Sequence, residues 1–387
     1  MPRRPDDTLL LTPGPVSVSY ATKAVMLVDR PSGDAAFQAE LAYAREYLVR
    51  IANGGDDYTA IPLPGSATYA NEAAMALLVP PEGKLLVHSN GVYGDRLIEI
   101  CEALGIAVAA LRTEPFTPPT GDLFAAALQA DPAITHVMLV HCETSTGVLN
   151  PLDEVAALCR AQGKGLLVDA VASFGAIAID LAALGADAVT LSSNKCMQGV
   201  PGVGWAVLRR AALEAAPPGR RSLCLDLREQ GSHMEATGAF RFTPPTQVVA
   251  AFAQACREHE AEGGSAARLA RYARNWRRLV DGMRQMGFRT VVPDAAASPI
   301  VATFHNPGHP AFSFDALYEG MKRRGFVIFP GRLALADTFR IGCMGDVDEQ
   351  DIAEAMVAVA ETMREMGVAS IGREAVSTIG REAATAA

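Results

Sequence analysis

Short apolar runs alternate with helical patterns from residue 84 onward, and this alternation constrains the fold more than any other feature of the sequence. The runs lie at 84–88, 106–111, 136–141, 165–169, 187–191 and 203–208, and helical patterns fill 94–104, 123–130 and 152–162. Strands that alternate with helices are typical of β–α–β units, whose strands are parallel. The sequence therefore predicts an α/β fold on a mostly parallel sheet.

The pattern changes near residue 256. Long helical patterns at 250–262 and 266–286 lead into strand-like runs at 288–292, 300–304 and 326–329, with further helical patterns at 314–324 and 349–366. Mixed strands and helices of this kind predict a smaller α+β domain. The last residues repeat the sequence IGREA at 371–375 and 379–383. Two copies beside an Ala/Thr-rich end predict a disordered tail rather than a repeat fold.

Composition excludes several classes of protein. The 387 residues carry 34 Lys+Arg against 43 Asp+Glu, a net charge of −9 that argues against nucleic-acid binding. The seven cysteines are widely separated and show no metal-binding spacing, which indicates reduced thiols in the cytoplasm and no metal site. The sequence has neither a signal peptide nor an apolar run of about 18 residues, so no membrane association is expected.

Polar side chains follow the predicted strands, where open parallel sheets bind ligands. Tyr93, Thr144, Asp169 and Lys195 each lie just beyond an apolar run. A fifth element is the turn 64–68 (PGSAT), which opens an apolar helix at 69–78. Free N–H groups at a helix start, with hydroxyls beside them, suit a phosphate. We therefore expect these groups to surround one phosphate-bearing ligand.

Each of these groups also has a simpler interpretation. A Gly-Ser turn often only caps a helix, a loop tyrosine usually packs, and an Asp after a strand, such as Asp169, often only caps the next helix. Lys195 is more distinctive, because it is one of five lysines and follows an apolar run. Together the groups match pyridoxal phosphate, which needs an amine for its aldehyde, a carboxylate for its ring nitrogen, an aromatic ring to stack on and a phosphate cradle.

The chain resembles the class V aminotransferases of fold type I over about residues 9–366. The resemblance rests on these segments: 12–15 (TPGP), 89–94 (SNGVYG), 141–147 (HCETSTG), 150–155 (NPLDEV), 168–175 (VDAVASFG), 192–202 (SSNKCMQGVPG), 241–243 (RFT) and 339–342 (FRIG). It implies a mostly parallel seven-stranded sheet with flanking helices and a smaller C-terminal α+β domain. It also implies an N-terminal active-site segment (1–18), a large cofactor-binding domain (19–255), a small domain (256–367) and the tail (368–387).

The resemblance implies roles for the matching residues. Lys195 corresponds to the Schiff-base lysine and Asp169 to the partner of the pyridine nitrogen. Tyr93 corresponds to the stacking residue, Val171 to a residue packed under the ring and Thr144 to a hydroxyl beside the 3′-oxygen. The residues matching the phosphate-binding set are Ser66, Ala67, Thr68, Asn194 and, donated by the other subunit of a homodimer, Thr243.

Two further matches concern the substrate. Arg340 corresponds to the arginine that grips a carboxylate, and Gly14 belongs to the segment that closes over the substrate. Residues 192–202, 222–227 and 241–243 favour the phosphonate branch of the family. This branch transfers the amino group of 2-aminoethylphosphonate to pyruvate, giving phosphonoacetaldehyde and L-alanine, in phosphonate catabolism.

Alternatives remain for the amino donor. One is an alanine–glyoxylate or serine–pyruvate aminotransferase; another is a transaminase of a related aminophosphonate. The second follows from residues 29–34 (DRPSGD), which replace a Trp-Asp segment of the phosphonate enzymes. These residues also add Arg30, whose side chain points either into the pocket or to solvent. A nicotinamide-binding protein is disfavoured because no G-x-G-x-x-G follows the first strand. A non-catalytic protein is disfavoured because Lys195, Asp169 and Arg340 are all present.

Overall fold

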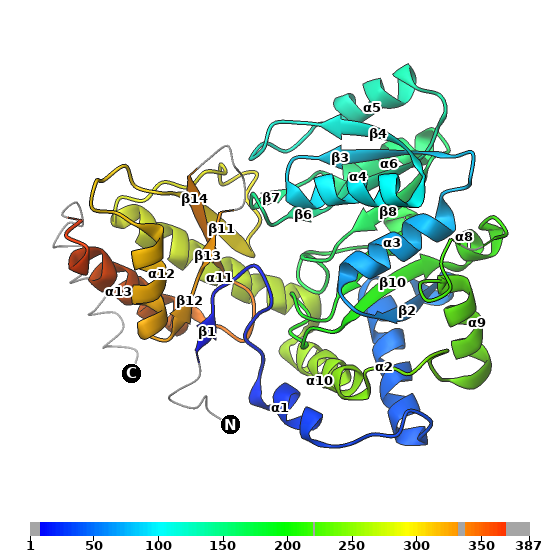
Figure 1. Ribbon diagram of the computed structural model, residues 1–387, viewed down its shortest axis with the longest axis horizontal. Helices are drawn as coiled ribbons and strands as arrows, with labels where there is room; N and C mark the ends of the chain where they lie inside the picture. Colours follow the sequence, from blue (N-terminus) through cyan, green and yellow to red (C-terminus); the bar gives the residue numbers. More distant parts are fainter. Residues whose placement is uncertain (1–7, 220, 332–336, 369–387) are drawn as a thin grey trace.

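The structure, a computed structural model, describes residues 8–219, 221–331 and 337–368. Its larger part is built on a seven-stranded sheet in the order β2-β10-β9-β8-β5-β3-β4 (Figure 1). β10 runs antiparallel to both neighbours and every other adjacent pair is parallel, which confirms the predicted sheet. The strands are β2 (Tyr58–Pro64), β3 (Lys84–Ser89), β4 (Ala107–Arg112), β5 (Ile134–Val140), β8 (Gly165–Asp169), β9 (Ala188–Ser192) and β10 (Val203–Arg209).

Helices cover this sheet and carry the crossovers between its strands. α3 packs on β9 and β10, α4 on β3 and β4, and α2 and α10 pack on each other beside β2. The helices of this part are α1 (Tyr20–Ala24), α2 (Ala35–Ile51), α3 (Ala67–Leu78), α4 (Val92–Leu104), α5 (Gly121–Ala130), α6 (Leu152–Ala161), α7 (Leu181–Leu184), α8 (Arg210–Ala215), α9 (Leu227–Thr237) and α10 (Thr246–Glu262), with short 3₁₀ turns η1 (Val25–Leu27) and η2 (Gly55–Asp57).

A smaller α+β part lies beside the large sheet, on the left of Figure 1. Its antiparallel sheet has the order β11-β14-β13, and β1 pairs in parallel with β12, so the beginning of the chain joins the C-terminal part. A two-stranded sheet, β6 with β7, projects from the larger part. The remaining elements are β1 (Leu9–Leu10), β6 (Cys142–Glu143), β7 (Val148–Leu149), α11 (Gly264–Gln285), β11 (Val301–His305), α12 (Phe314–Arg323), β12 (Phe326–Val327), β13 (Phe329–Pro330), β14 (Thr338–Gly342) and α13 (Glu349–Glu365).

Each part has its own apolar core. The larger core draws on residues from Phe37 to Cys256, and the second joins Leu9 and Leu11 to residues between Leu279 and Val368. A third cluster, which includes Val16, Cys196 and Val301, lies where the two parts meet. The domain limits expected after residues 18, 255 and 367 stay predictions. The predicted tail lies outside the described residues, apart from Val368.

Several elements differ from the sequence-based expectation. The residues expected to form a strand at 288–292 make only an isolated bridge, between Thr290 and Phe304. Helices α2 and α9, strand β2 and several shorter elements were not predicted. β2 carries Pro62 and Pro64, which normally argue against a strand. Its position at the edge of the sheet accommodates them, because only one of its sides pairs with a neighbour.

Candidate active site

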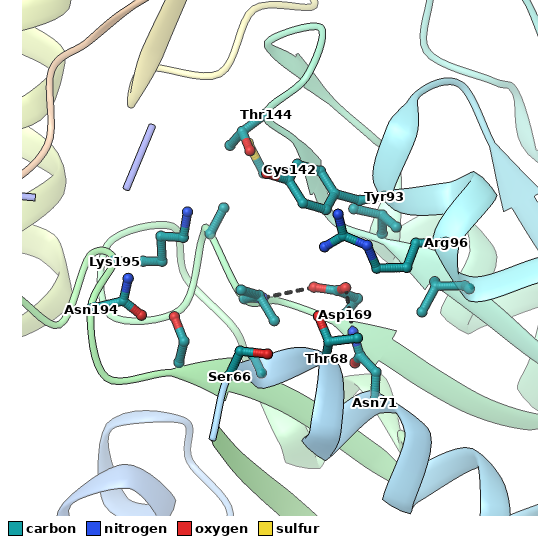
Figure 2. A pocket seen from close by; sticks show the side chains of 16 residues that line it. Ser66, Thr68, Asn71, Tyr93, Arg96, Cys142, Thr144, Asp169, Asn194 and Lys195 are labelled. Carbon is teal, nitrogen blue, oxygen red and sulfur yellow. Dashed lines mark hydrogen bonds between the residues drawn. The ribbon is translucent and has the colours of Figure 1, made fainter. Parts of the chain in front are cut away.

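A cavity of about 200 Å³ lies at the carboxyl edge of the large sheet (Figure 2). It gathers side chains from the start of α3, from α4, and from the residues that follow β5, β8 and β9. Every predicted site residue lines it except Gly14, Thr243 and Arg340. The lining residues are Ser66, Ala67, Thr68, Asn71, Tyr93, Arg96, Leu97, Val140, Cys142, Thr144, Asp169, Val171, Ala172, Ser192, Asn194 and Lys195.

Lys195 enters the cavity from the turn after β9. Its Nζ donates a hydrogen bond to the carbonyl oxygen of Pro13 at 2.5 Å. Burial lowers the pKa of this amine from 10.5 to about 8, and the nearby Arg340 guanidinium acts in the same direction, against the attraction of Asp169. An amine with this pKa holds and releases a proton near neutral pH.

Asp169 ends β8 with both carboxylate oxygens occupied. Oδ1 accepts from the backbone N–H of Val171 at 3.0 Å, and Oδ2 accepts from Asn71 Nδ2 at 2.7 Å. Thr190 donates to the Asn71 side-chain oxygen, which fixes the amide in this orientation. Burial raises the pKa of Asp169, while these hydrogen bonds and Arg96 lower it. The residues after Asp169 form a turn rather than the helix considered in the sequence analysis, and Asp169 caps this turn while it also faces the cavity (Figure 2).

The sequence analysis missed Asn71, although one signal was available. Asn71 stands one helical turn beyond Ala67, so it shares a face with the phosphate-binding turn. Its buried amide in an otherwise apolar helix face could have marked it. Arg96 was also missed. It lies one turn beyond Tyr93 on α4, and its guanidinium carbon is 5.0 Å from the centre of the Tyr93 ring.

The start of α3 has the features of an anion cradle. Ser66 precedes the helix without a side-chain capping hydrogen bond, so the first N–H groups face the cavity without help from that hydroxyl. Gly65 adopts a φ of 128°, which favours glycine. Nearby, the Ser192 hydroxyl is buried and has no hydrogen-bond partner in the part of the chain that the structure describes. These donors fit the phosphate of pyridoxal phosphate, and Lys195 and Asp169 fit its aldehyde and ring nitrogen.

Gly14 and Arg340 lie next to the cavity without lining it. Gly14 has a φ of 113°, and a Cβ there would stand 2.4 Å from Lys195 Nζ, so only glycine fits. Arg340 is buried on β14, where Nη1 donates to the carbonyl oxygen of Thr144 at 2.7 Å and Nη2 to that of Pro330 at 2.9 Å. Its charge therefore stands beside Thr144, at one end of the cavity.

Thr243 lies away from the cavity of its own chain. It lines a separate exposed groove with residues 32–33 and 239–244. Arg30 does not reach the cavity either. Its guanidinium donates to the carbonyl oxygens of Val25 and Val28 at 2.6 and 2.9 Å, and Nε lies 3.4 Å from a Glu40 oxygen. Arg30 therefore points neither into the cavity nor into open solvent, the two orientations that the sequence left open. Its guanidinium is held by nearby backbone carbonyl groups and lies close to Glu40.

Within residues 8–219, 221–331 and 337–368, no three or more His, Cys, Asp or Glu side chains group in a way that could hold a metal ion. Across the same residues, no helix has both the length and the apolar character needed to cross a membrane.

Comparison with known proteins gives consistent results. Residues 20–320 match the family model described as aminotransferase class-V. A 2-aminoethylphosphonate–pyruvate transaminase from Cupriavidus necator is 46% identical over 94% of this chain and 97% of its own length. One of the same name from Burkholderia thailandensis is 47% identical over 95% of this chain and 100% of its own.

Solved structures extend the comparison to three dimensions. A pyridoxamine–pyruvate aminotransferase from Mesorhizobium loti superposes with a TM-score of 0.85 at 25% identity, covering 99% of each chain. An alanine–glyoxylate aminotransferase from Nostoc gives a TM-score of 0.86 at 25% identity, covering 94% of this chain and 97% of the other. These matches confirm the fold-type I architecture expected from the sequence.

Proposed function

The chain belongs to the class V aminotransferases, and from this premise we propose that it transfers the amino group of 2-aminoethylphosphonate to pyruvate, giving phosphonoacetaldehyde and L-alanine. One observation carries the proposal. Relatives bearing that activity in their names are 46–47% identical over nearly the whole chain. The cavity supports it, because Lys195 and Asp169 line the same cavity as the start of α3, which has the features of an anion cradle. Such a reaction belongs to phosphonate catabolism.

The donors of the cavity would hold pyridoxal phosphate. Ser66, Thr68, the N–H groups at the start of α3, Asn194 and Ser192 would bind the phosphate. Asp169 would hold the ring nitrogen in its protonated form, while Tyr93 and Val171 would enclose the ring and Thr144 would meet the 3′-oxygen. The bound cofactor would supply an aldehyde that takes up the amino group and a ring that accepts electrons.

Lys195 would then move the proton. Its amine, with a pKa of about 8, would take a proton from the amino-bearing carbon of the donor. It would deliver this proton to C4′, the aldehyde carbon of the cofactor. Gly14 leaves room for this movement, because any side chain at residue 14 would collide with Nζ. The covering segment that includes Pro13 would also exclude water from the site.

Arg340 would bind the anionic end of both substrates. Pyruvate carries a carboxylate and the donor a phosphonate, and a planar guanidinium can pair with two oxygens of either group. The carbonyl oxygens of Thr144 and Pro330 orient the guanidinium. Because the two substrates occupy the site in alternate half-reactions, one arginine suffices for both.

We infer a homodimer in which the partner subunit's Thr243 completes the phosphate site. Thr243 lies outside the cavity of its own chain, in an exposed groove. Phe242, which lines the same groove, is 48% exposed, and Tyr69, at the start of α3, is 49% exposed. Burial of such side chains against a second copy would stabilise the dimer.

We also infer a cytoplasmic location. All seven cysteines are unpaired, and six of them are buried. Free thiols in this number are typical of proteins kept in a reducing compartment.

A donor screen tests the proposed function. Purified protein with pyridoxal phosphate is mixed with pyruvate and one donor, and alanine and the released aldehyde are measured. The donors are 2-aminoethylphosphonate, a hydroxylated aminophosphonate and serine, and alanine is tested with glyoxylate. We expect 2-aminoethylphosphonate to react fastest and the Lys195→Ala variant to be inactive. Brisk alanine–glyoxylate transfer without alanine formation from 2-aminoethylphosphonate would refute the donor assignment.

A further inference from the structure

Glu143 is a buried carboxylate that does not line the cavity and has no direct part in the proposed reaction. It ends β6 and its side chain has no exposure to solvent. Oε2 accepts from the backbone N–H groups of Tyr93 at 3.1 Å and Gly94 at 3.2 Å. Oε1 accepts from the N–H of Ser145 at 3.1 Å and from the Ser145 hydroxyl. Among the described residues, no Lys or Arg forms an ion pair with it.

These bonds replace the missing cap of helix α4. The residue before the helix is Gly91, which has no side chain to cap it. Instead, Ser145 Oγ accepts from the N–H of Val92 at 3.0 Å, and Glu143 accepts from the next two N–H groups. A Cβ on Gly91 would lie 2.5 Å from both Glu143 and Ser145, so glycine permits this close approach. A negative charge here also complements the helix dipole.

The position of this cap gives it a consequence beyond helix stability. Tyr93, whose N–H it holds, lines the cavity from α4, and Thr144, the next residue after Glu143, lines it from another wall. Figure 2 shows Tyr93 and Arg96 on α4 at one side of the cavity, with Cys142 of β6 and Thr144, which follows β6, nearby. Glu143 thus joins two walls of the cavity through one carboxylate.

We propose that Glu143 is a positioning residue that fixes the first turn of α4 against residues 143–145 and so sets where Tyr93 and Thr144 meet the cofactor ring. The inference rests on the proposed cofactor site. A helix cap alone would affect only the stability of the fold. A positioning residue would affect cofactor affinity and the environment of the bound ring in a protein that remains folded.

Protonation of Glu143 offers a second way to test this proposal. Burial raises its pKa from 4.5 to about 7, and the Asp169 carboxylate acts in the same direction, while the hydrogen bonds from Ser145 and Gly94 oppose it. The other ionisable groups on the elements around it are Tyr93, Asp95 and Arg96 at the start of α4, Glu99, Cys101 and Glu102 further along α4, Cys142 on β6 and Arg340 on β14. The acid form carries an O–H donor, so it satisfies fewer of the N–H and O–H donors that converge on it.

The test compares Glu143→Gln with Glu99→Gln. The first keeps the shape of the side chain but turns an NH₂ group toward N–H donors. The second removes the same charge from an exposed position on the same helix. We measure the dissociation constant of pyridoxal phosphate for the cofactor-free protein, the visible circular dichroism of the bound cofactor, and the melting temperature of the cofactor-free protein.

For Glu143→Gln we expect a folded protein whose cofactor affinity falls roughly tenfold or more, with an altered dichroic band. Glu99→Gln should match the wild type. Wild-type affinity should weaken as the pH falls through about 7, and this dependence should flatten in Glu143→Gln. Wild-type affinity and dichroism in Glu143→Gln would reduce Glu143 to a cap and overturn the inference.

Glu143→Asp keeps the charge on a shorter side chain, and it decides the matter if Glu143→Gln does not fold. Its carboxylate cannot reach both Tyr93 and Ser145, so we expect an intermediate affinity; an unchanged one would again overturn the inference. The proposed function fails differently, because then the wild-type protein itself would not bind pyridoxal phosphate, and this inference would fall with it.

Discussion

At the scale of single residues, the cavity holds ionisable groups whose charges are poorly solvated, so their pKa values differ from the ordinary ones. Burial lowers the pKa of Lys195 and raises that of Asp169, so each charged form depends on the other and on nearby polar groups. Perturbed groups of opposite charge in one cavity are typical of active sites. The arrangement leaves Lys195 able to change its protonation state close to neutral pH.

The pKa of Lys195 leads to a prediction about pH. A lysine whose pKa is lowered by burial loses its proton as the pH rises through about 8 rather than 10.5. Only the neutral amine attacks an aldehyde, so the rate at which the cofactor-free protein captures pyridoxal phosphate should rise between pH 7 and 9 and then level off. Stopped-flow absorbance measures this rate. A rate still climbing steeply at pH 10 would show that the amine is not perturbed.

Asn71 carries the second prediction at this scale. It provides one of the two hydrogen bonds that hold the Asp169 carboxylate. Asn71→Ala should lower kcat about 10- to 100-fold with little change in KM, because a hydrogen bond to a charged group is worth about 1.5–3 kcal/mol. Lys164→Ala, a change far from the cavity lining, serves as the control. Unaltered kcat in Asn71→Ala would mean that Val171 alone orients Asp169.

At the scale of elements, the parallel strands follow from local sequence, and so do the cavity residues that lie at the strand ends, but the contacts between the cavity walls do not. Apolar runs such as 165–169 predict buried strands because a strand covered on both faces needs no polar alternation. Lys195, Asp169 and Tyr93 were predictable, since each follows such a run. The hydrogen bonds of Asn71 and Glu143 were not predictable, because the partners lie 98 and 50 residues away and only the folded chain brings them together. Strand β2 was not predicted because its two prolines argue against a strand.

One element contact can be tested by a small change. Gly204 on β10 lies under the start of α3, and a Cβ there would meet the Ser66 oxygen at 2.8 Å and the Ala67 Cα at 3.0 Å. These are backbone atoms, which cannot rotate away. Gly204→Ala should therefore displace the phosphate-binding turn at a cost of about 1–3 kcal/mol. In affinity for pyridoxal phosphate this corresponds to a loss of about tenfold or more.

Gly308→Ala is the matched control, because no atom lies within 4 Å of a Cβ at that position. Fluorescence titration of both cofactor-free variants gives the two dissociation constants. Equal affinities would show that the turn can shift without losing its phosphate contacts.

At the scale of the whole molecule, the end of the cavity near Lys195 and Thr144 lies where the two parts of the chain meet. The larger part supplies Lys195, the N-terminal segment supplies Pro13 and Gly14 against it, and the smaller part supplies Arg340 against Thr144. The site therefore requires the correct docking of both parts. In the proposed dimer it also requires a second chain, and this last requirement can be tested by subunit complementation.

Two inactive variants should restore each other in a mixed dimer. Lys195→Ala removes the amine, and Thr243→Asp puts a negative charge where the phosphate would bind. If Thr243 acts across the interface, the heterodimer has one intact site. That site combines the unchanged Lys195 of the Thr243→Asp subunit with the unchanged Thr243 of the Lys195→Ala subunit. Co-expression with two different affinity tags isolates this heterodimer. Its activity should be about half that of the wild-type dimer. If Thr243 instead served its own subunit, neither site would be complete, and the heterodimer would be as inactive as its parents.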